Sequence, residues 1–207
     1  NYVKYSGRLA EDLRSTNNNG VVWANQFDNV ANYKGHYETT GKEIWEQTEG
    51  KIDGFICASG TGGTIAGVSN FLKEKNKNIK IYLSDPKGSC LYSYIKTKEF
   101  KSEGNSITEG IGSSRVTKNF EKALIDDAYS IDDISALKVL FDLIEKEGLS
   151  LGTSSGINVA GAIKLAQELG PNKTIVTILC DKSDRYQGKL FNKKFLMDKN
   201  LPYPKWL

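Results

Sequence analysis

A short glycine-rich segment, CASGTGGTIAG (Cys57–Gly67), lies between two apolar stretches and constrains the fold more than any other part of the sequence. The residues that lead into it, Ile52–Ser59, form an apolar run with β-branched and aromatic side chains, which is typical of a buried strand. From Thr64 onward, apolar side chains recur at helical spacing. A strand, a glycine-rich turn and a helix in this order indicate an α/β domain, in which ligands bind beyond the carboxyl ends of the strands.

Predicted strands and helices alternate along the rest of the chain. The apolar runs Ile79–Pro86 and Lys173–Asp181 predict two further strands, and helical spacing predicts helices over 132–148 and 155–170. Residues 87–128 are rich in Gly, Ser, Lys and Thr and are expected to be irregular. Because strands that are separated by helices form mostly parallel sheets, we expect a three-layer α/β fold: an open, mostly parallel sheet with helices on both faces.

Both ends of the helix predicted over 132–148 are marked in the sequence. Asp132 and Asp133 can cap its first turn, and Gly148 can end it. One face of this helix is expected to be apolar and to carry Ile134, Leu137, Leu140, Phe141 and Ile144.

Composition excludes several classes of function. The net charge is only +3 and the basic residues are scattered, so we expect no nucleic-acid partner. No apolar run approaches the roughly 20 residues of a membrane helix. Cys57, Cys90 and Cys180 have no metal-ligand spacing, so we expect no metal site and reduced thiols in a cytoplasmic protein. His36 is the single histidine, which excludes catalysis by paired histidines.

The glycine-rich segment matches neither of two well-known phosphate-binding patterns. For the dinucleotide pattern, Gly60 and Gly62 fit but Ile65 stands at the last glycine position. For the P-loop, Gly62 and Gly67 have the right spacing but Val68 stands where a lysine is needed. The remaining interpretation is a loop that binds one phosphate monoester with backbone N–H groups and threonine hydroxyls. The alternative is a tight turn without a ligand.

A second cluster of small residues, LSLGTSSGIN (Leu149–Asn158), precedes another predicted helix. By itself Ser154–Gly156 would be interpreted as a helix cap. Because the two clusters are expected at the same edge of the sheet, together they indicate one cofactor that is held at two points.

Four segments, spread through most of the chain, form a distinctive combination. They are NQFDNVANYKGHYETTGKEIWEQTEGKIDGFICASGTGGTIAGVS, SITEGIGSSRVTKN, EGLSLGTSSGINVAGAIKLA and DRYQGKLFNKKFL. With these segments the chain resembles the pyridoxal-phosphate (PLP) enzymes of the cysteine synthase (O-acetylserine sulfhydrylase) family, a fold-type II group that includes cystathionine β-synthase. The resemblance implies the large-domain part of that fold and PLP (pyridoxal 5'-phosphate) as the cofactor.

The resemblance also implies how PLP is bound. Ser154 matches the serine that hydrogen-bonds the pyridine nitrogen. A serine hydroxyl cannot neutralise a pyridinium, so the ring stays largely neutral, which suits β-elimination. The residues that match the phosphate-binding loop are Gly60, Thr61, Gly62, Gly63 and Thr64.

Two further matches concern the substrate. Gln26 matches the glutamine near the substrate carboxylate, and its alternative interpretation is a polar turn residue. Gly110, Ile111 and Gly112 match a glycine segment that lines the site, and the alternative is that these glycines only serve backbone geometry.

The resemblance leaves one residue unmatched. The family's Schiff-base lysine lies far upstream, and no lysine here has its context. We therefore expect a fragment that lacks the Schiff-base lysine, contains no catalytic residue and is inactive alone. Residues 1–22 are expected to be the tail of a small N-terminal domain, and 23–207 the large PLP-phosphate-binding domain.

The implied function is cysteine biosynthesis, in which O-acetylserine loses acetate and sulfide is added. Two alternatives stay open. The first is a related β-replacement enzyme, such as a cystathionine β-synthase or cyanoalanine synthase, and the second is a non-catalytic homologue that binds a partner protein. The resemblance further implies a homodimer and serine acetyltransferase as a possible partner.

Overall fold

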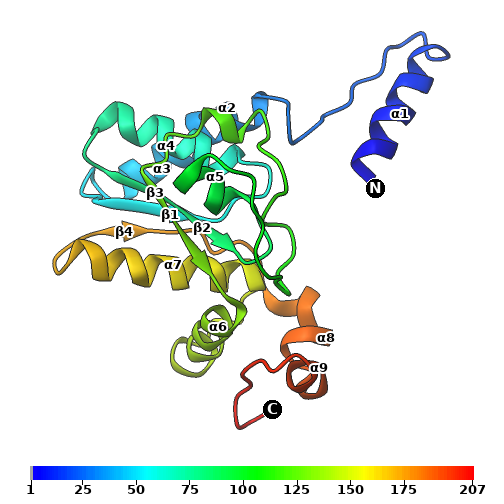
Figure 1. The fold of residues 1–207 in the computed structure, drawn as a ribbon. Coiled ribbons are helices and arrows are strands. Elements are labelled where there is room, and N and C mark those ends of the chain that lie inside the picture. Colours follow the sequence, from blue (N-terminus) through cyan, green and yellow to red (C-terminus); the bar gives the residue numbers. More distant parts are fainter. Residues whose placement is uncertain (1) are drawn as a thin grey trace.

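Four parallel strands form the central sheet of the structure, a computed structural model that describes residues 2–207 (Figure 1). Their order is β3-β2-β1-β4, and each neighbouring pair is parallel. The strands are β1 (Gly54–Cys57), β2 (Lys80–Pro86), β3 (Asp127–Ile131) and β4 (Ile175–Val176).

Helices cover both faces of the sheet, so the predicted three-layer α/β fold is confirmed (Figure 1). Helices α3, α4 and α5 lie on one face, with α2 packed on α4, whereas α6 and α7 lie on the other face. The longer helices are α1 (Tyr2–Arg14), α2 (Ala31–Glu38), α3 (Thr40–Gln47), α4 (Gly63–Lys75), α5 (Leu91–Thr97), α6 (Asp133–Glu147) and α7 (Thr153–Leu169). Short elements complete the chain: α8 (Gln187–Leu190), α9 (Lys193–Asp198) and 3₁₀ turns at Phe120–Lys122 and Ser183–Tyr186.

The central strand β1 is buried on both faces. Phe55 and Cys57 pack towards α4, in a cluster with Ile65, whereas Ile56 points to the opposite face and packs with Leu165 of α7. Successive residues of a strand point to opposite faces, so a strand covered on both sides needs a continuous apolar run. This is why an apolar run predicted the strand correctly.

The structure corrects the prediction for the last strand. Only Ile175–Val176 of the predicted Lys173–Asp181 pairs as a strand. Beyond it, the side-chain amide of Asn158 lies between the segment after β1 and the segment after β4. Ala58 N–H donates to Asn158 Oδ1 (2.6 Å), and Asn158 Nδ2 donates to Ile178 O (2.7 Å). A side chain therefore replaces the backbone ladder, which a hydrophobicity pattern cannot show.

Two other parts of the chain also differ from expectation. Residues 87–128, expected to be irregular, contain α5 and the beginning of β3. In α6 two of the predicted caps are confirmed, because Asp132 accepts a hydrogen bond from Ser135 N–H (2.8 Å) and Gly148 has φ +68°. The carboxylate of Asp133 instead accepts a hydrogen bond from Ile107 N–H (2.9 Å). Ile134 was expected on the buried face but is 45% exposed, and the buried stripe includes Ala136 instead.

Helix α1 stands apart from the sheet in Figure 1. The segment between α1 and α2 contains no helix or strand, and Trp23 in this segment packs against Gly7 of α1. This is the part of the chain that was expected to be the tail of a small domain, and the division at residues 22 and 23 stays a prediction.

Helices α2 and α4 approach each other so closely that two glycines of α4 have no room for a side chain. A Cβ at Gly67 would lie 2.4 Å from Tyr33 O and 2.5 Å from His36 Cβ. A Cβ at Gly63 would lie 1.9 Å from Asn32 Oδ1. Because Asn32 and His36 are one turn apart on α2, this contact places both side chains next to the glycine-rich turn.

We predict that Gly67→Ala destabilises the protein by about 1–3 kcal/mol, because the added methyl group would collide with the backbone of α2. Gly35→Ala is the matched control: Gly35 is also helical, and nothing lies within 4 Å of its Cβ position. It should stabilise the protein by roughly 0.5–1 kcal/mol, as Ala does relative to Gly within a helix. Urea unfolding of both variants measures the difference, and equal stabilities would contradict this packing.

Candidate functional site

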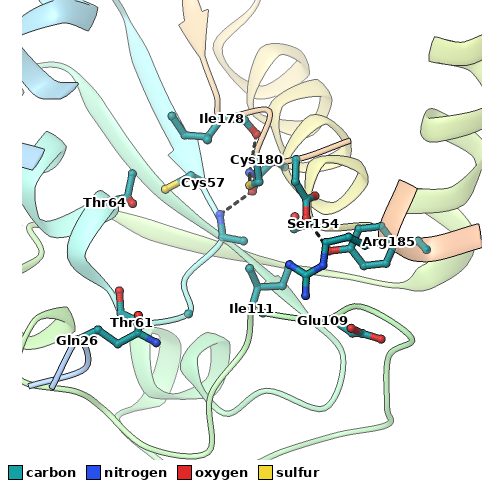
Figure 2. Close-up of a pocket in the computed structure, with 16 residues that line it drawn as sticks. Gln26, Cys57, Thr61, Thr64, Glu109, Ile111, Ser154, Ile178, Cys180 and Arg185 are labelled. Atoms are coloured by element: carbon teal, nitrogen blue, oxygen red, sulfur yellow. Dashed lines mark hydrogen bonds between the residues drawn. The ribbon is translucent and has the colours of Figure 1, made fainter. Parts of the chain in front are cut away.

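A pocket of about 370 Å³ lies at the carboxyl end of β1, next to the first turns of α4 and α7. Figure 2 shows Gln26, Thr61 and Thr64 on one side of it, and Ser154 and Arg185 on the opposite side. Its lining residues are Gln26, Cys57, Ala58, Gly60, Thr61, Thr64, Glu109, Gly110, Ile111, Ser154, Asn158, Ile178, Cys180, Asp181, Arg185 and Tyr186.

The structure brings most of the predicted site residues together in this pocket. Both small-residue clusters contribute to its wall, as expected from their places at the same edge of the sheet. Two predicted loop residues, Gly62 and Gly63, are buried and do not line the pocket. Gly112 also lies outside the lining. The predicted residues in the wall are Gln26, Gly60, Thr61, Thr64, Gly110, Ile111 and Ser154, and their roles in binding stay predictions.

At two positions of the loop the surrounding backbone leaves no room for a side chain, so glycine is needed there whether or not a ligand is bound. A Cβ at Gly60 would lie 2.3 Å from Gly110 O. Gly62 has φ +86°, which side chains rarely adopt, and its Cβ would lie 2.6 Å from the backbone of Phe120. The loop is therefore pressed between two other loops, and a bulkier residue would displace it from the pocket.

Both threonine hydroxyls of the loop contact side chains of α2. Thr61 Oγ1 accepts hydrogen bonds from Asn32 Nδ2 (3.1 Å) and from Gly63 N–H (3.3 Å). Since both partners are donors, the hydroxyl proton of Thr61 is free to bind an acceptor in the pocket. Thr64 Oγ1 lies 3.2 Å from Nε2 of His36.

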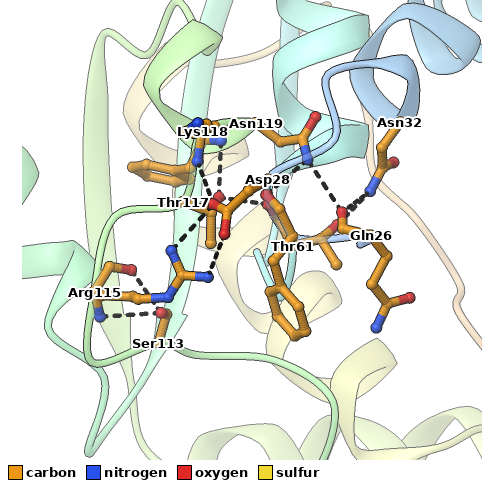
Figure 3. A network of polar contacts seen from close by, with 11 residues as sticks. Gln26, Asp28, Asn32, Thr61, Ser113, Arg115, Thr117, Lys118 and Asn119 are labelled. Carbon is orange, nitrogen blue, oxygen red and sulfur yellow. Dashed lines mark hydrogen bonds and ion pairs between the residues drawn. The ribbon is translucent and has the colours of Figure 1, made fainter. Parts of the chain in front are cut away.

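Gln26 enters the pocket from a segment whose backbone is held firmly (Figure 3). Its carbonyl oxygen accepts hydrogen bonds from Asn32 Nδ2 (2.6 Å) and Asn119 Nδ2 (3.1 Å). The preceding residue, Asn25, has φ +43°, a left-handed conformation that asparagine tolerates better than most residues. The side chain of Gln26 extends away from these hydrogen bonds.

An ion pair fastens the same segment to the chain between α5 and β3. Arg115 donates to both carboxylate oxygens of Asp28 (3.1 and 2.9 Å), and the backbone N–H of Lys118 donates to Asp28 Oδ1 (3.0 Å). The hydrogen bond from Arg115 lowers the pKa of Asp28 below its usual value. Because Arg115 is half exposed, the pair contributes little to stability, and its main effect is to fix the position of the segment.

The opposite wall is built on the first turns of α7. Ser154 is only 4% exposed, and the hydroxyl oxygen of the next residue, Ser155, accepts a hydrogen bond from Cys180 N–H (3.0 Å). Asp181 accepts a hydrogen bond from the Tyr186 hydroxyl (2.8 Å). These contacts hold the segment after β4 against the start of α7.

The comparisons with known proteins agree with this geometry. Residues 2–181 match the family model described as "Pyridoxal-phosphate dependent enzyme". This chain belongs to the pyridoxal-phosphate dependent enzyme family. The match covers most of the chain, including both walls of the pocket up to Asp181.

The relatives of this PLP-family chain include several cysteine synthases. Cysteine synthase 1 of Neurospora crassa is 46% identical over 206 residues, which cover 97% of this chain and 54% of the relative. A cysteine synthase of Dictyostelium discoideum is 45% identical and is covered to 53%. The chain therefore spans about half the length of these curated relatives.

A solved structure supports the same fold. The crystal structure of an O-acetylserine dependent cystathionine beta-synthase from Helicobacter pylori matches with a TM-score of 0.76 and 31% identity. The match covers 86% of this chain and 56% of that chain. The predicted resemblance to fold-type II PLP enzymes is thus confirmed.

The donors and acceptors of the pocket fit PLP. The first turn of α4 and the hydroxyls of Thr61 and Thr64 offer donors to a phosphate group, and Ser154 offers a hydroxyl on the opposite side. One buried oxygen of a lining residue, Asp181 Oδ1, has no hydrogen-bond partner among residues 2–207. A polar ligand would offer such an atom a partner.

Several lining residues were not predicted from the sequence. Cys180, Asp181 and Arg185 come from the segment CDKSDRY, which follows β4. Burial raises the pKa of the Cys180 thiol, which is therefore uncharged at neutral pH. Glu109 is paired with Lys189 at 2.5 Å, and this hydrogen bond lowers the pKa of Glu109.

The described part of the chain lacks three further features. No lysine of residues 2–207 lines the pocket. No group of three or more His, Cys, Asp or Glu side chains in that range could hold a metal ion. None of the helices in that range is both long and apolar enough to cross a membrane.

We predict that Thr61→Val weakens PLP binding about 10- to 100-fold, because the phosphate loses a hydrogen bond to a charged group worth about 1.5–3 kcal/mol. Thr61→Ser keeps the hydroxyl and should stay within about 3-fold of the unchanged protein. Titrations with PLP and with pyridoxal, which lacks the phosphate, measure the effect by calorimetry. An equal loss for both ligands would show that Thr61 does not bind the phosphate.

Proposed function

We propose that this chain forms the cofactor-binding part of a PLP-dependent β-replacement enzyme of the cysteine synthase type. The observation that carries the proposal is the single pocket in which the glycine loop (Gly60–Thr64) and Ser154 face each other from the first turns of two helices. The cysteine synthases among its relatives support the choice of O-acetylserine and sulfide as substrates.

In this proposal the two walls of the pocket bind different parts of the cofactor. Bound PLP supplies an electron sink that allows acetate to leave O-acetylserine. The N–H groups of the first turn of α4, with the hydroxyls of Thr61 and Thr64, bind the phosphate dianion. The Ser154 hydroxyl hydrogen-bonds the pyridine nitrogen without neutralising a positive charge on it, so the ring stays largely neutral. The Gln26 side chain, whose backbone is fixed by two asparagines, orients the substrate carboxylate.

The proposal extends to the assembly of the protein. We propose a homodimer in the cytoplasm with serine acetyltransferase as a partner, on the basis of the resemblance in sequence to cysteine synthases. Size-exclusion chromatography with light scattering, with and without serine acetyltransferase, measures both associations.

The proposed chemistry is tested by adding PLP and O-acetylserine to the protein. We expect no turnover by the 207-residue chain alone. When an upstream segment that carries the Schiff-base lysine is supplied, in cis or as a second chain, we expect acetate release, and cysteine formation when sulfide is present. Ser154→Ala should weaken PLP binding by about 1 kcal/mol, or roughly 5-fold, as expected for a neutral hydrogen bond. Ser154→Asp should protonate the ring and lower kcat much more than PLP affinity. The control is Ser102→Ala, because Ser102 is exposed and outside the pocket. Full activity of Ser154→Asp would contradict the neutral-ring argument.

A second candidate function is favoured by Arg185. This side chain lines the pocket and makes no hydrogen bond or close ion pair within residues 2–207, although its charge acts on the nearby Glu109 and helps to lower the pKa of that carboxyl. A guanidinium without a hydrogen-bonded partner attracts an anionic group such as a carboxylate. The enzyme would then accept a thiol that carries its own carboxylate, such as homocysteine, rather than sulfide. The similarity to O-acetylserine dependent cystathionine beta-synthases supports this candidate.

The two candidates differ in how they respond to loss of Arg185. If homocysteine is the nucleophile, Arg185→Ala should raise its KM about 10-fold or more and leave the KM for sulfide within about 2-fold, because only homocysteine loses an ion pair. Lys182→Ala is the control, since it removes a nearby positive charge that does not line the pocket. Steady-state kinetics with each nucleophile measure this, and an unchanged KM for homocysteine would favour the cysteine synthase reaction.

A further inference from the structure

The single histidine of the chain lies between two threonine hydroxyls. His36 Nε2 is 3.2 Å from Thr64 Oγ1, and His36 Nδ1 is 3.0 Å from Thr40 Oγ1. The ring cannot drift away from the loop, because α2 is packed against Gly67 of α4, where a Cβ would lie 2.5 Å from His36 Cβ. The position of the imidazole is therefore set by the contact between the two helices.

The two loop threonines differ in how their protons are arranged. The oxygen of Thr61 has two partners that can only donate, namely the amide of Asn32 and the N–H of Gly63, so its proton points elsewhere. The amide orientation of Asn32 is fixed in turn, because its nitrogen also donates to Gln26 O at 2.6 Å. For Thr64 the direction of the hydrogen bond depends on which nitrogen of His36 carries the proton.

A phosphate dianion has only acceptors, so a threonine that binds it must donate. If Nδ1 carried the proton, Nε2 would accept the Thr64 proton and remove it from the phosphate. If Nε2 carries the proton, it donates to Thr64 Oγ1, and the Thr64 proton is released towards the pocket. Thr40 completes the second arrangement by donating to Nδ1. Burial lowers the pKa of His36, so the ring is neutral at pH 7.5 and has one proton to place.

We infer that His36 is a positioning residue: its Nε2–H donates to Thr64 Oγ1 and thereby directs the Thr64 hydroxyl proton to a phosphate oxygen. The inference rests on the proposed phosphate-binding role of the loop. It assigns a role to a residue outside the pocket lining, and it makes the two threonines equivalent: each accepts from α2 and donates to the ligand.

The test reads the tautomer directly. Because the 207-residue chain has one histidine, ¹⁵N-labelled histidine gives one pair of ring nitrogen signals without assignment. At pH 7.5, with saturating inorganic phosphate and then with PLP, we expect Nε2 to be protonated and Nδ1 to be bare. A protonated Nδ1 in the bound state would overturn the inference while leaving phosphate binding, and with it the proposed function, intact. If neither phosphate nor PLP binds, the proposed role of the loop fails, and the inference fails with it.

Variants provide a second readout that a structural role alone would not produce. In His36→Gln the side-chain amide reaches as far as Nε2 and can still donate to Thr64, so the dissociation constant for PLP should stay within about 3-fold. In His36→Asn the shorter side chain cannot reach, and PLP should bind about 10-fold more weakly. Thr64→Val should cause a similar loss, and combining it with His36→Asn should add nothing further. Additive losses, or equal losses for Gln and Asn, would overturn the inference, and circular dichroism confirms that each variant is folded.

Discussion

The close contact between α2 and α4 determines the arrangement of the glycine loop. Gly63 and Gly67 have no space for a Cβ, so the backbones of the two helices approach more closely than ordinary side chains allow. This approach brings Asn32 and His36 within hydrogen-bonding distance of Thr61 and Thr64. The glycines of this segment therefore have two tasks. Some expose the backbone at the pocket, and others let a supporting helix reach the hydroxyls from behind.

A single side chain organises the opposite wall. Asn158 of α7 satisfies Ala58 N–H and Ile178 O where the ladder between β1 and β4 ends. The segments that follow β1 and β4 are no longer paired beyond this point, and both of them line the pocket together with Asn158. Buried backbone groups need partners, and here side chains supply them: the amide of Asn158, and the hydroxyl of Thr177, which donates to Ile56 O (2.7 Å). The carboxyl end of a parallel sheet thus becomes a site through local replacement of its hydrogen bonds.

Sequence reasoning succeeded where one physical property decides a structure. The apolar run before the glycines predicted β1 because that strand is covered on both faces, and Asp132 and Gly148 predicted both ends of α6 because caps act within a few residues. It overestimated β4, whose pairing ends at Asn158, and it missed both α5, in the polar segment 87–128, and β3, which begins at the end of that segment. These elements depend on partners that are distant in the chain.

The sequence by itself determined the strand, the glycine turn and the helix around residue 60, the second cluster at Ser154, and the family to which the chain belongs. Short-range spacing and local composition are sufficient for such features, because each depends on residues that are neighbours along the chain. Only the tertiary structure decided which loop residues reach the pocket. It left Gly62 and Gly63 out of the pocket lining, and it placed His36 within hydrogen-bonding distance of Thr64, across a separation of 28 residues. Contacts of this kind form when helices pack, and packing is governed by shape in three dimensions rather than by the order of residues.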